Sequence, residues 1–200
     1  MPSYKLTYFD IPGIAQHIRY ILSYANQPFE DVRLNSKEWP KLKENYPYGK
    51  LPIFEIDGKV FNQSNAIARY LAKQYGLNGK SDLETLEVEC LADTLVDLRN
   101  GLSAIFYEKD GEKQRELTRN LLQNLFPTYL KKFEEIAAKS TSGWLVGSQI
   151  TWADLFFASS LALFEEKFPG VLKSYPALTA LVEKVENIPS IKAYLEKHQK

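Results

Sequence analysis

The chain has 200 residues, with 25 basic and 25 acidic side chains and a net charge of zero. This length allows one large domain or two small ones, with ample apolar content for a core. The charges are spread along the chain without a basic stripe for nucleic acid or a polybasic patch for anionic lipid. We therefore expect neither a nucleic acid nor a membrane as a partner.

Cysteine and histidine usage narrows the chemistry further. The single Cys90 excludes an intramolecular disulfide, and only two histidines are present. A histidine-based metal cluster or a Cys–His nucleophile pair is therefore not expected. The amino terminus leads directly into a strand pattern without a signal peptide, which together with the lone cysteine predicts a cytoplasmic location. Cys90 falls in an apolar stripe, where we expect it to be buried.

The first part of the chain alternates strand and helix patterns. Residues 4–9 alternate apolar and polar side chains as a half-buried strand does, and residues 14–26 predict a helix. Residues 29–34 predict a second strand, which is followed by a loop with Trp39 and Lys43, a hairpin and a helix. This order predicts a layered α/β unit.

The stretch from the hairpin to the next helix is the most informative. Two short apolar runs, 51–56 and 59–61, flank Asp57-Gly58 and predict a hairpin with a tight turn. A helix pattern follows at once, so Ser64 lies where unpaired backbone N–H groups and the helix dipole favour a carboxylate or phosphate. Pro52 begins the strand, where a cis bond would expose neighbouring backbone groups to a ligand. We interpret this stretch as a cradle for a small, anionic, peptide-like molecule.

Beyond residues 78–81, which are rich in turn formers, the pattern is helical only. Pro127 interrupts the second long helical pattern and predicts a kink or a restart there. Thr151 and Asp154 have the spacing of a capping box, which we interpret as structural. The first long helix carries an apolar stripe of Leu83, Leu86, Val88, Leu91, Leu95, Leu98 and Leu102.

The chain resembles the sigma class of cytosolic glutathione transferases, a class that includes haematopoietic prostaglandin D synthases and invertebrate detoxification enzymes. The resemblance implies a thioredoxin-like domain at 1–77, a linker at 78–81 and an all-α domain at 82–200 with a hydrophobic substrate pocket. It also implies a homodimer that uses glutathione as co-substrate. The motifs that carry it are Tyr4-Lys5-Leu6-Thr7-Tyr8-Phe9, Trp39-Pro40, Gly49-Lys50-Leu51-Pro52, Glu55-Ile56-Asp57-Gly58, Gln63-Ser64, Ala66-Ile67-Ala68-Arg69-Tyr70-Leu71 and Thr151-Trp152-Ala153-Asp154.

Tyr8 matches the catalytic tyrosine of this class. A thiol is mostly protonated at neutral pH, whereas the nucleophile is the thiolate. A phenolic O–H that donates to the sulfur anion favours the charged form and lowers the thiol pKa. The alternative is that Tyr8 is one of twelve tyrosines and merely packs at a strand end.

The same resemblance implies a set of glutathione-binding residues. Its members are Tyr8, Trp39, Lys43, Lys50, Leu51, Pro52, Gln63 and Ser64. In this assignment Gln63 and Ser64 hold the γ-glutamyl end, the Leu51 backbone pairs with the cysteinyl part, and the tryptophan and lysines contact the glycine end. The alternatives are a plain helix cap for Gln63 and Ser64, a loop anchor for Trp39, and solvated surface lysines.

Two aspartates on the first long helix complete the implied set. Asp97 matches an aspartate that reaches the glutathione of the partner subunit, and its alternative is an exposed helical carboxylate. Asp93 and Asp97 suggest only a weak cation site at the dimer axis, because the third acidic position of the prostaglandin synthases is Val96 here. We therefore expect no metal.

Phe9, Ile14, Ala104 and Tyr107 are expected to line an apolar pocket for the second substrate. Two of them depart from the prostaglandin synthases, which have an arginine in place of Ile14 and a tryptophan in place of Ala104. The sequence therefore favours conjugation of the glutathione thiolate to hydrophobic electrophiles. The alternatives are a glutathione-dependent prostaglandin isomerase or peroxidase, a crystallin-like structural protein, and a ligand carrier.

Overall fold

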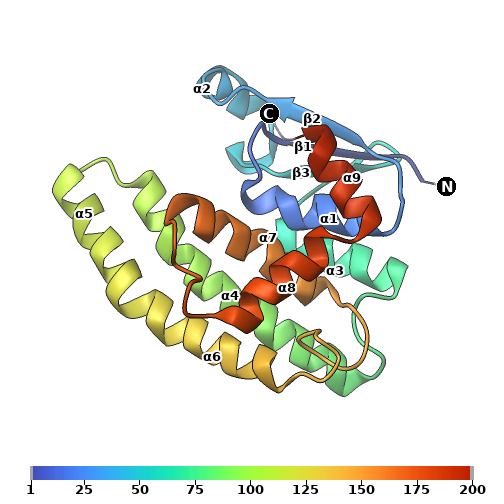
Figure 1. The fold of residues 1–200 in the computed structure, drawn as a ribbon. Helices are drawn as coiled ribbons and strands as arrows, with labels where there is room; N and C mark the ends of the chain where they lie inside the picture. Colours follow the sequence, from blue (N-terminus) through green and yellow to red (C-terminus); the bar gives the residue numbers. More distant parts are fainter. Residues whose placement is uncertain (1, 199–200) are drawn as a thin grey trace. The chain divides into compact units, whose positions relative to one another are not determined.

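The computed structural model describes residues 2–198, and its contacts divide the chain into two compact units (Figure 1). One unit runs to Asn78 and also contains the segment that begins at Glu186, and the other is Gly79–Val185. The C-terminal helix α9 (Pro189–His198) thus belongs by its contacts to the first unit. The domain boundaries given by the resemblance, 1–77 and 82–200, stay a prediction.

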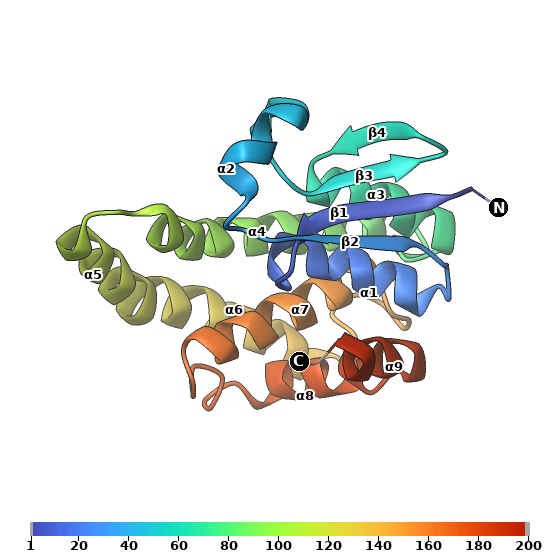
Figure 2. The same ribbon diagram turned by 90° about the horizontal axis from the view of Figure 1, so that it is seen from above.

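A four-stranded mixed sheet with the order β2-β1-β3-β4 forms the centre of the first unit (Figure 2). β1 pairs with β2 in parallel, whereas β1 with β3 and β3 with β4 are antiparallel. The strands are β1 (Tyr4–Phe9), β2 (Glu30–Leu34), β3 (Ile53–Ile56) and β4 (Lys59–Asn62). The predicted α/β unit is therefore confirmed.

The β3–β4 hairpin has the predicted tight turn. Asp57 and Gly58 have φ of 49° and 81°, the left-handed conformations that a two-residue hairpin loop requires. β3 begins later than expected because Pro52 lacks the N–H that would pair in the sheet. The Leu51–Pro52 peptide bond is cis.

Helices α1 (Gln16–Tyr24) and α3 (Ser64–Tyr75) pack on each other below the sheet in Figure 1, and α9 packs on α1. The helices of this unit are α1 (Gln16–Tyr24), which follows a 3-10 turn at Gly13–Ala15, α2 (Trp39–Leu42), α3 (Ser64–Tyr75) and α9. The Tyr20 hydroxyl donates to Glu186 Oε1 at 3.0 Å, and Arg33 Nη2 donates to the Tyr194 hydroxyl at 2.7 Å. These two bonds attach the C-terminal segment to the sheet unit.

The described residues of the second unit form helices joined by loops, with no strand among them. Its helices are α4 (Asp82–Tyr107), α5 (Gly111–Asn120), α6 (Phe126–Lys139), α7 (Trp152–Lys167) and α8 (Pro176–Glu186). A π-helical turn, Leu121–Leu125, separates α5 from α6, which begins at Phe126 and has Pro127 in its first turn, so the predicted restart is confirmed. Among residues 2–198 no helix is long and apolar enough to cross a membrane.

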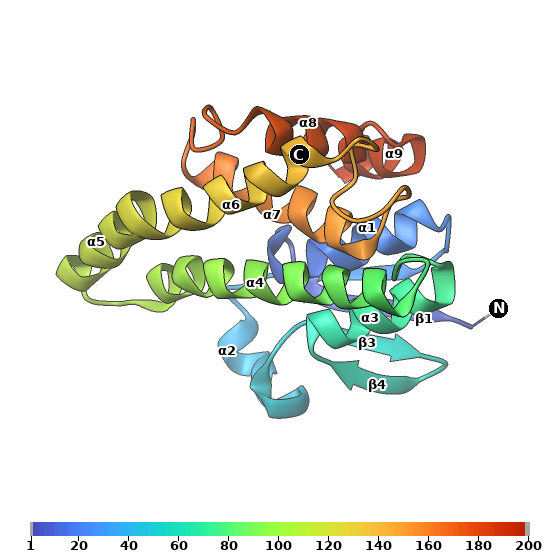
Figure 3. The same ribbon diagram turned by 90° about the horizontal axis from the view of Figure 1, so that it is seen from below.

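Helix α7 is the core of this unit and lies between α4 and α6 (Figure 3). Every residue from 151 to 161 is buried. Phe157 meets Phe133 of α6 edge to face at 4.7 Å. The start of α7 carries a capping box, in which Asp154 Oδ2 accepts from the Thr151 N–H at 2.7 Å and from its hydroxyl at 2.9 Å.

The apolar stripe of α4 is only partly buried. Val88, Leu95 and Leu98 are fully buried, but Leu83 and Leu86 are 65% and 58% exposed. Cys90 is also exposed, so the expectation that it is buried was wrong. The stripe drifts around the helix because α4 is long and buries a single face, on which the cysteine does not lie.

Candidate active site

The register of the sheet brings three predicted segments to one of its ends. Thr7 pairs with Ile53, and Ile53 pairs with Asn62. Because both ladders are antiparallel, the residue after Thr7, the residues before Ile53 and the residue after Asn62 all lie at the same end of the sheet. Tyr8, Leu51-Pro52 and Gln63-Ser64 therefore gather at one end of the sheet, although more than 50 positions separate Tyr8 from Ser64.

Tyr8 is held tightly at this end. It is only 8% exposed, and its hydroxyl accepts from the Ile14 N–H at 3.4 Å. Gly13 has φ of +49°, and a Cβ at that position would lie 2.6 Å from the Tyr8 hydroxyl oxygen. The turn between β1 and α1 thus needs a glycine both for its conformation and for the space that the phenol occupies.

The backbone before α3 has an uncommon conformation. Gln63 has φ of 74°, and its side chain makes no capping bond at the helix start among the described residues. Gln63 thus caps α3 through its backbone carbonyl, which accepts from the Ile67 N–H at 3.0 Å, and not through its side chain. Ser64 is the first residue of α3, where unpaired N–H groups and the dipole favour an anion.

Aromatic rings connect Tyr8 to the loop after β2. The centre of the Phe9 ring lies 5.4 Å from that of Tyr8 and 5.4 Å from that of Trp39. The ring centres of Trp39 and Tyr46 are also 5.4 Å apart. Lys43 and Lys50 are both exposed, and the backbone between them is compact, with the Lys50 N–H bonded to the Pro47 carbonyl at 3.2 Å. Trp39 thus anchors its loop, which is compatible with a ligand contact as well.

Comparisons with known proteins agree over the whole chain. Residues 4–73 match the model of the glutathione S-transferase N-terminal domain, and residues 96–198 match that of the C-terminal domain. A glutathione S-transferase of Anopheles gambiae is 39% identical over 198 residues, which is 98% of this chain and 97% of the relative. The chain belongs to the glutathione S-transferase family. Its activity class is therefore glutathione transfer, with glutathione as co-substrate.

Solved structures of this family superpose closely. The structure of prostaglandin synthase D of Nilaparvata lugens is 39% identical with a TM-score of 0.93, and the match covers 98% of each chain. A glutathione S-transferase of the hookworm Necator americanus, described as monomeric, is 37% identical with a TM-score of 0.85, covering 99% of this chain and 98% of that one. The thioredoxin-like transferase fold is thereby confirmed.

The remaining predicted residues lie on α4 of the second unit. Asp93, Asp97 and Ala104 are exposed, and Tyr107 is 76% exposed. Their roles in this transferase, and those of Phe9 and Ile14, stay predictions. Within residues 2–198 no group of three or more potential ligand side chains could hold a metal ion.

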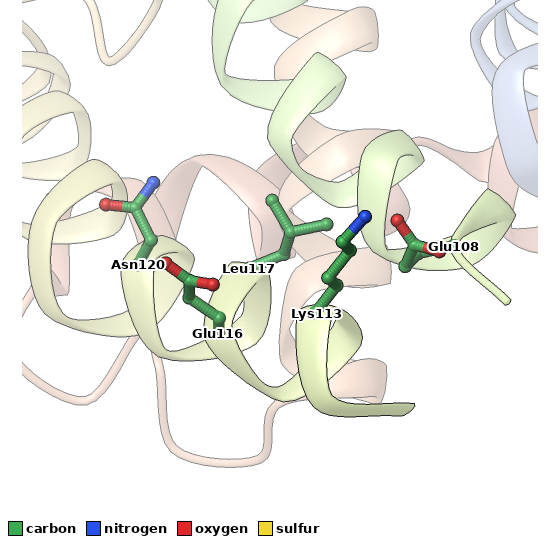
Figure 4. Close-up of a pocket in the computed structure, with 5 residues that line it drawn as sticks. All are labelled: Glu108, Lys113, Glu116, Leu117 and Asn120. Carbon is green, nitrogen blue, oxygen red and sulfur yellow. The ribbon is translucent and has the colours of Figure 1, made fainter. Parts of the chain in front are cut away.

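Two surface hollows lie apart from the residues predicted to bind glutathione. One of about 330 Å³ is lined by Glu108, Lys113, Glu116, Leu117 and Asn120 near the end of α4 and along α5 (Figure 4). The other, of about 300 Å³, is lined by Phe54, Ile56, Lys59, Phe61, Asn62, Ala66, Ile67 and Tyr70. No predicted site residue of this transferase lines either hollow.

Burial shifts the pKa of several ionisable groups. Desolvation raises the pKa of Asp154 to about 6, although bonds from Leu145 and Thr151 oppose the shift. It also raises the pKa of Tyr194 to about 12 and that of Tyr20, which lies beside the Glu186 carboxylate. These groups hold the fold rather than the predicted site.

The sequence reasoning missed two parts of the Tyr8 environment, namely the Ile14 N–H and Arg19. The amide bond leaves no signature in the sequence because any residue except proline supplies a backbone N–H. Arg19 does leave a signal, because it lies between Ile18 and Tyr20 in a helix with few charges. It is completely buried, and its Cζ lies 6.0 Å from the centre of the Tyr8 ring.

Proposed function

We propose that this protein is a sigma-class transferase that conjugates the thiolate of glutathione to hydrophobic electrophiles. The observation that carries the proposal is the end of the sheet where Tyr8, Leu51-Pro52 and Gln63-Ser64 gather. An enzyme that binds an extended tripeptide needs a strand edge, an anion site and a donor for the sulfur close together. Family membership makes glutathione the tripeptide.

Each segment has a distinct role in the proposed mechanism. The backbone at Leu51 pairs with the cysteinyl part, and the N-terminus of α3 with Gln63 and Ser64 receives the γ-glutamyl carboxylate. Trp39, Lys43 and Lys50 receive the glycine end, where an ammonium meets a carboxylate.

The Tyr8 hydroxyl donates a hydrogen bond to the glutathione sulfur and stabilises its thiolate. The thiolate then attacks an electrophilic carbon, forming the C–S bond as the leaving group departs or as an activated double bond accepts the electron pair. The Ile14 N–H supports this role, because a donor to the phenolic oxygen stabilises the partial negative charge that grows there. Phe9, whose ring contacts Tyr8, gives the reacting sulfur an apolar neighbour.

The deciding experiment is the ultraviolet absorbance of the bound thiolate across pH in wild type and in Tyr8→Phe. We expect wild type to ionise the thiol at least one pH unit below the free value of about 8.5, and Tyr8→Phe to restore that value. Tyr4→Phe is a matched control, because Tyr4 lies on the same strand and is similarly buried. A bound thiol with an unshifted pKa in wild type would contradict the proposal.

A glutathione-dependent prostaglandin isomerase is the second candidate. The observation in its favour is the likeness to the structure of prostaglandin synthase D of Nilaparvata lugens. Ile14 and Ala104 favour conjugation, because the positive charge and the indole expected of such isomerases are absent from these positions. Product analysis with a prostaglandin endoperoxide and with an aryl halide separates the two, since isomerisation returns glutathione unchanged.

We also propose a homodimer in the cytoplasm that needs no metal. Leu83 and Leu86, exposed on α4, would be covered by a partner, and Asp97 lies on the same helix. Light scattering after gel filtration should give twice the chain mass for wild type and the single mass for Leu83→Lys/Leu86→Lys. A wild-type monomer, the state described for the hookworm relative, would refute the dimer. Unchanged activity in EDTA would support independence from metal.

A further inference from the structure

The buried guanidinium of Arg19 is bound to the turn that carries the Ile14 N–H. Arg19 is completely buried on α1, and its Nη1 donates to the Ile11 carbonyl at 2.8 Å and to the Pro12 carbonyl at 3.4 Å. These two carbonyls belong to the segment between β1 and the 3-10 turn. Arg19 therefore fixes the backbone immediately before Gly13 and Ile14.

That backbone in turn contacts the phenol of Tyr8. The Ile14 N–H donates to the Tyr8 hydroxyl at 3.4 Å, and Gly13 leaves the phenol just enough room. A shift of the turn by less than an ångström would break this long bond or press Gly13 against the ring. The Tyr8 hydroxyl and the Arg19 guanidinium thus both bond to the backbone of the same short segment, residues 11–14.

Arg19 belongs to a small network of two arginines and two aspartates. Its Nε donates to Asp31 Oδ1 at 3.2 Å, but Asp31 also pairs with Arg33, and Arg33 pairs with Asp10. Two arginines thus face two aspartates, one of them 60% exposed. Nη2 of Arg19 is buried without a hydrogen-bond partner among residues 2–198. A buried guanidinium N–H without a partner costs stability, so a role for this arginine outside stability is worth testing.

We propose that Arg19 is a positioning residue for Tyr8, which holds the 11–14 turn so that the Ile14 N–H meets the phenolic oxygen. The guanidinium adds a positive charge 6.0 Å from the centre of the Tyr8 ring, on a side chain without access to solvent. From its place over the ring, this charge favours the negative charge that develops at the hydroxyl and the sulfur. The inference rests on the proposed function of Tyr8.

Arg19→Met tests the inference, because methionine fills apolar space but has neither the charge nor the donors. We expect kcat to fall about 10-fold, as a misaligned catalytic donor would cause, with the KM for glutathione changed less than threefold. The pKa of the bound thiol should rise toward the value in Tyr8→Phe. Arg19→Lys, which keeps the charge, should recover part of the loss.

Arg99→Met is the matched control. Arg99 is also a buried arginine, with its Cζ 5.4 Å from the centre of the Phe156 ring and its Nη1 bonded to Ser160 at 2.6 Å. A general loss of stability from removing a buried arginine would affect both variants, whereas a change in the thiol pKa is expected for Arg19→Met only. If Arg19→Met fails to fold, Arg19→Met/Asp31→Asn, which also removes the carboxylate that Arg19 shares with Arg33, is measured in its place.

A readout without glutathione separates this inference from the proposed function. The amide proton signal of Ile14 should move in Arg19→Met in the same direction as in Tyr8→Phe, because both variants lose the amide–phenol bond. A folded Arg19→Met with the wild-type Ile14 signal and the wild-type thiol pKa would overturn the inference. If wild type does not lower the thiol pKa, the proposed function fails, and the Ile14 signal alone decides whether Arg19 positions Tyr8.

Discussion

The sheet unit and the helical unit of this transferase are built on different principles. At the sheet end that carries Tyr8, left-handed backbone conformations accumulate, with φ of 49° at Gly13 and 74° at Gln63. Helix α7, in contrast, has regular geometry, a capping box and buried aromatic contacts. The difference teaches that the region of the proposed site tolerates locally unfavourable backbone conformations, whereas the helical unit gains stability through packing.

The largest effect is expected from a substitution that disrupts the packing of the helical unit. Phe157→Ala removes a fully buried ring from α7 that meets Phe133 at 4.7 Å. We expect a loss of about 3–5 kcal/mol in the free energy of unfolding, because the cavity cannot collapse between two helices. Urea unfolding followed by circular dichroism measures this loss. A loss below about 1 kcal/mol would mean that α7 is not the core of its unit.

Tyr8→Phe should reduce activity and leave stability nearly unchanged, in contrast to Phe157→Ala. Removing one hydroxyl keeps the ring contacts with Phe9, so we expect the free energy of unfolding to change by less than about 1 kcal/mol. The kcat for conjugation should fall about 100-fold or more, because the donor to the developing anion is lost. Steady-state kinetics with an aryl halide, beside urea unfolding of the same preparation, tests both halves. Full activity with reduced stability would make Tyr8 a structural residue.

The sequence predicted much of both regions, and its errors have physical reasons. Periodicity and turn chemistry gave the hairpin at Asp57-Gly58 and the capping box at Thr151, because those features depend on residues close in the chain. The exposure of Cys90 could not be read in this way, because a stripe of apolar residues does not say which face of a long helix finds a partner.

The candidate site shows the same limit. The residue types at Tyr8 and Ser64 pointed to thiol and anion chemistry, but only the register of β1, β3 and β4 brings them to one sheet end. The contribution of Arg19 was missed because a buried arginine is recognised by its surroundings rather than by spacing. Its carbonyl partners, Ile11 and Pro12, accept through the backbone, which carries no sequence signal.

The Asp154 cap of α7 should make the stability of the helical unit depend on pH. Burial raises the pKa of Asp154 from 3.8 to about 6, so between these values the folded chain keeps a proton that the unfolded chain has lost. The free energy of unfolding should therefore fall by up to about 2–3 kcal/mol as the pH rises from 4 to 6, and this contribution should stay constant above that range.

Asp154→Asn isolates this effect from the other carboxylates. The amide cannot ionise, so the difference between wild type and Asp154→Asn should change across pH 4–6 in favour of the variant. Activity per folded molecule should be the same in both proteins, since Asp154 lies in the capping box. Urea unfolding at several pH values provides the comparison. A difference that is constant with pH would show that Asp154 keeps its usual pKa when buried.

The smallest effects are expected from alanine substitutions at two glycines with left-handed φ, Gly13 and Gly58. Gly13 has φ of +49° and Gly58 of +81°, and a Cβ at Gly58 would meet no atom within 4 Å, whereas at Gly13 it would lie 2.6 Å from the Tyr8 hydroxyl. Both substitutions by alanine should cost about 1–2 kcal/mol of stability through backbone strain. Only Gly13→Ala should also reduce kcat, by roughly 10-fold, because the methyl group must displace the phenol or the turn that carries the Ile14 N–H.

The pair separates strain from alignment because the backbone cost is shared and the contact with the phenol is not. Urea unfolding and kcat measured on both variants give the two quantities independently. Equal kcat in Gly13→Ala and Gly58→Ala would mean that Tyr8 tolerates displacement. The close fit of Gly13 against the phenol would then serve the fold of the turn alone, and the left-handed conformations near the sheet end would have no special tie to catalysis.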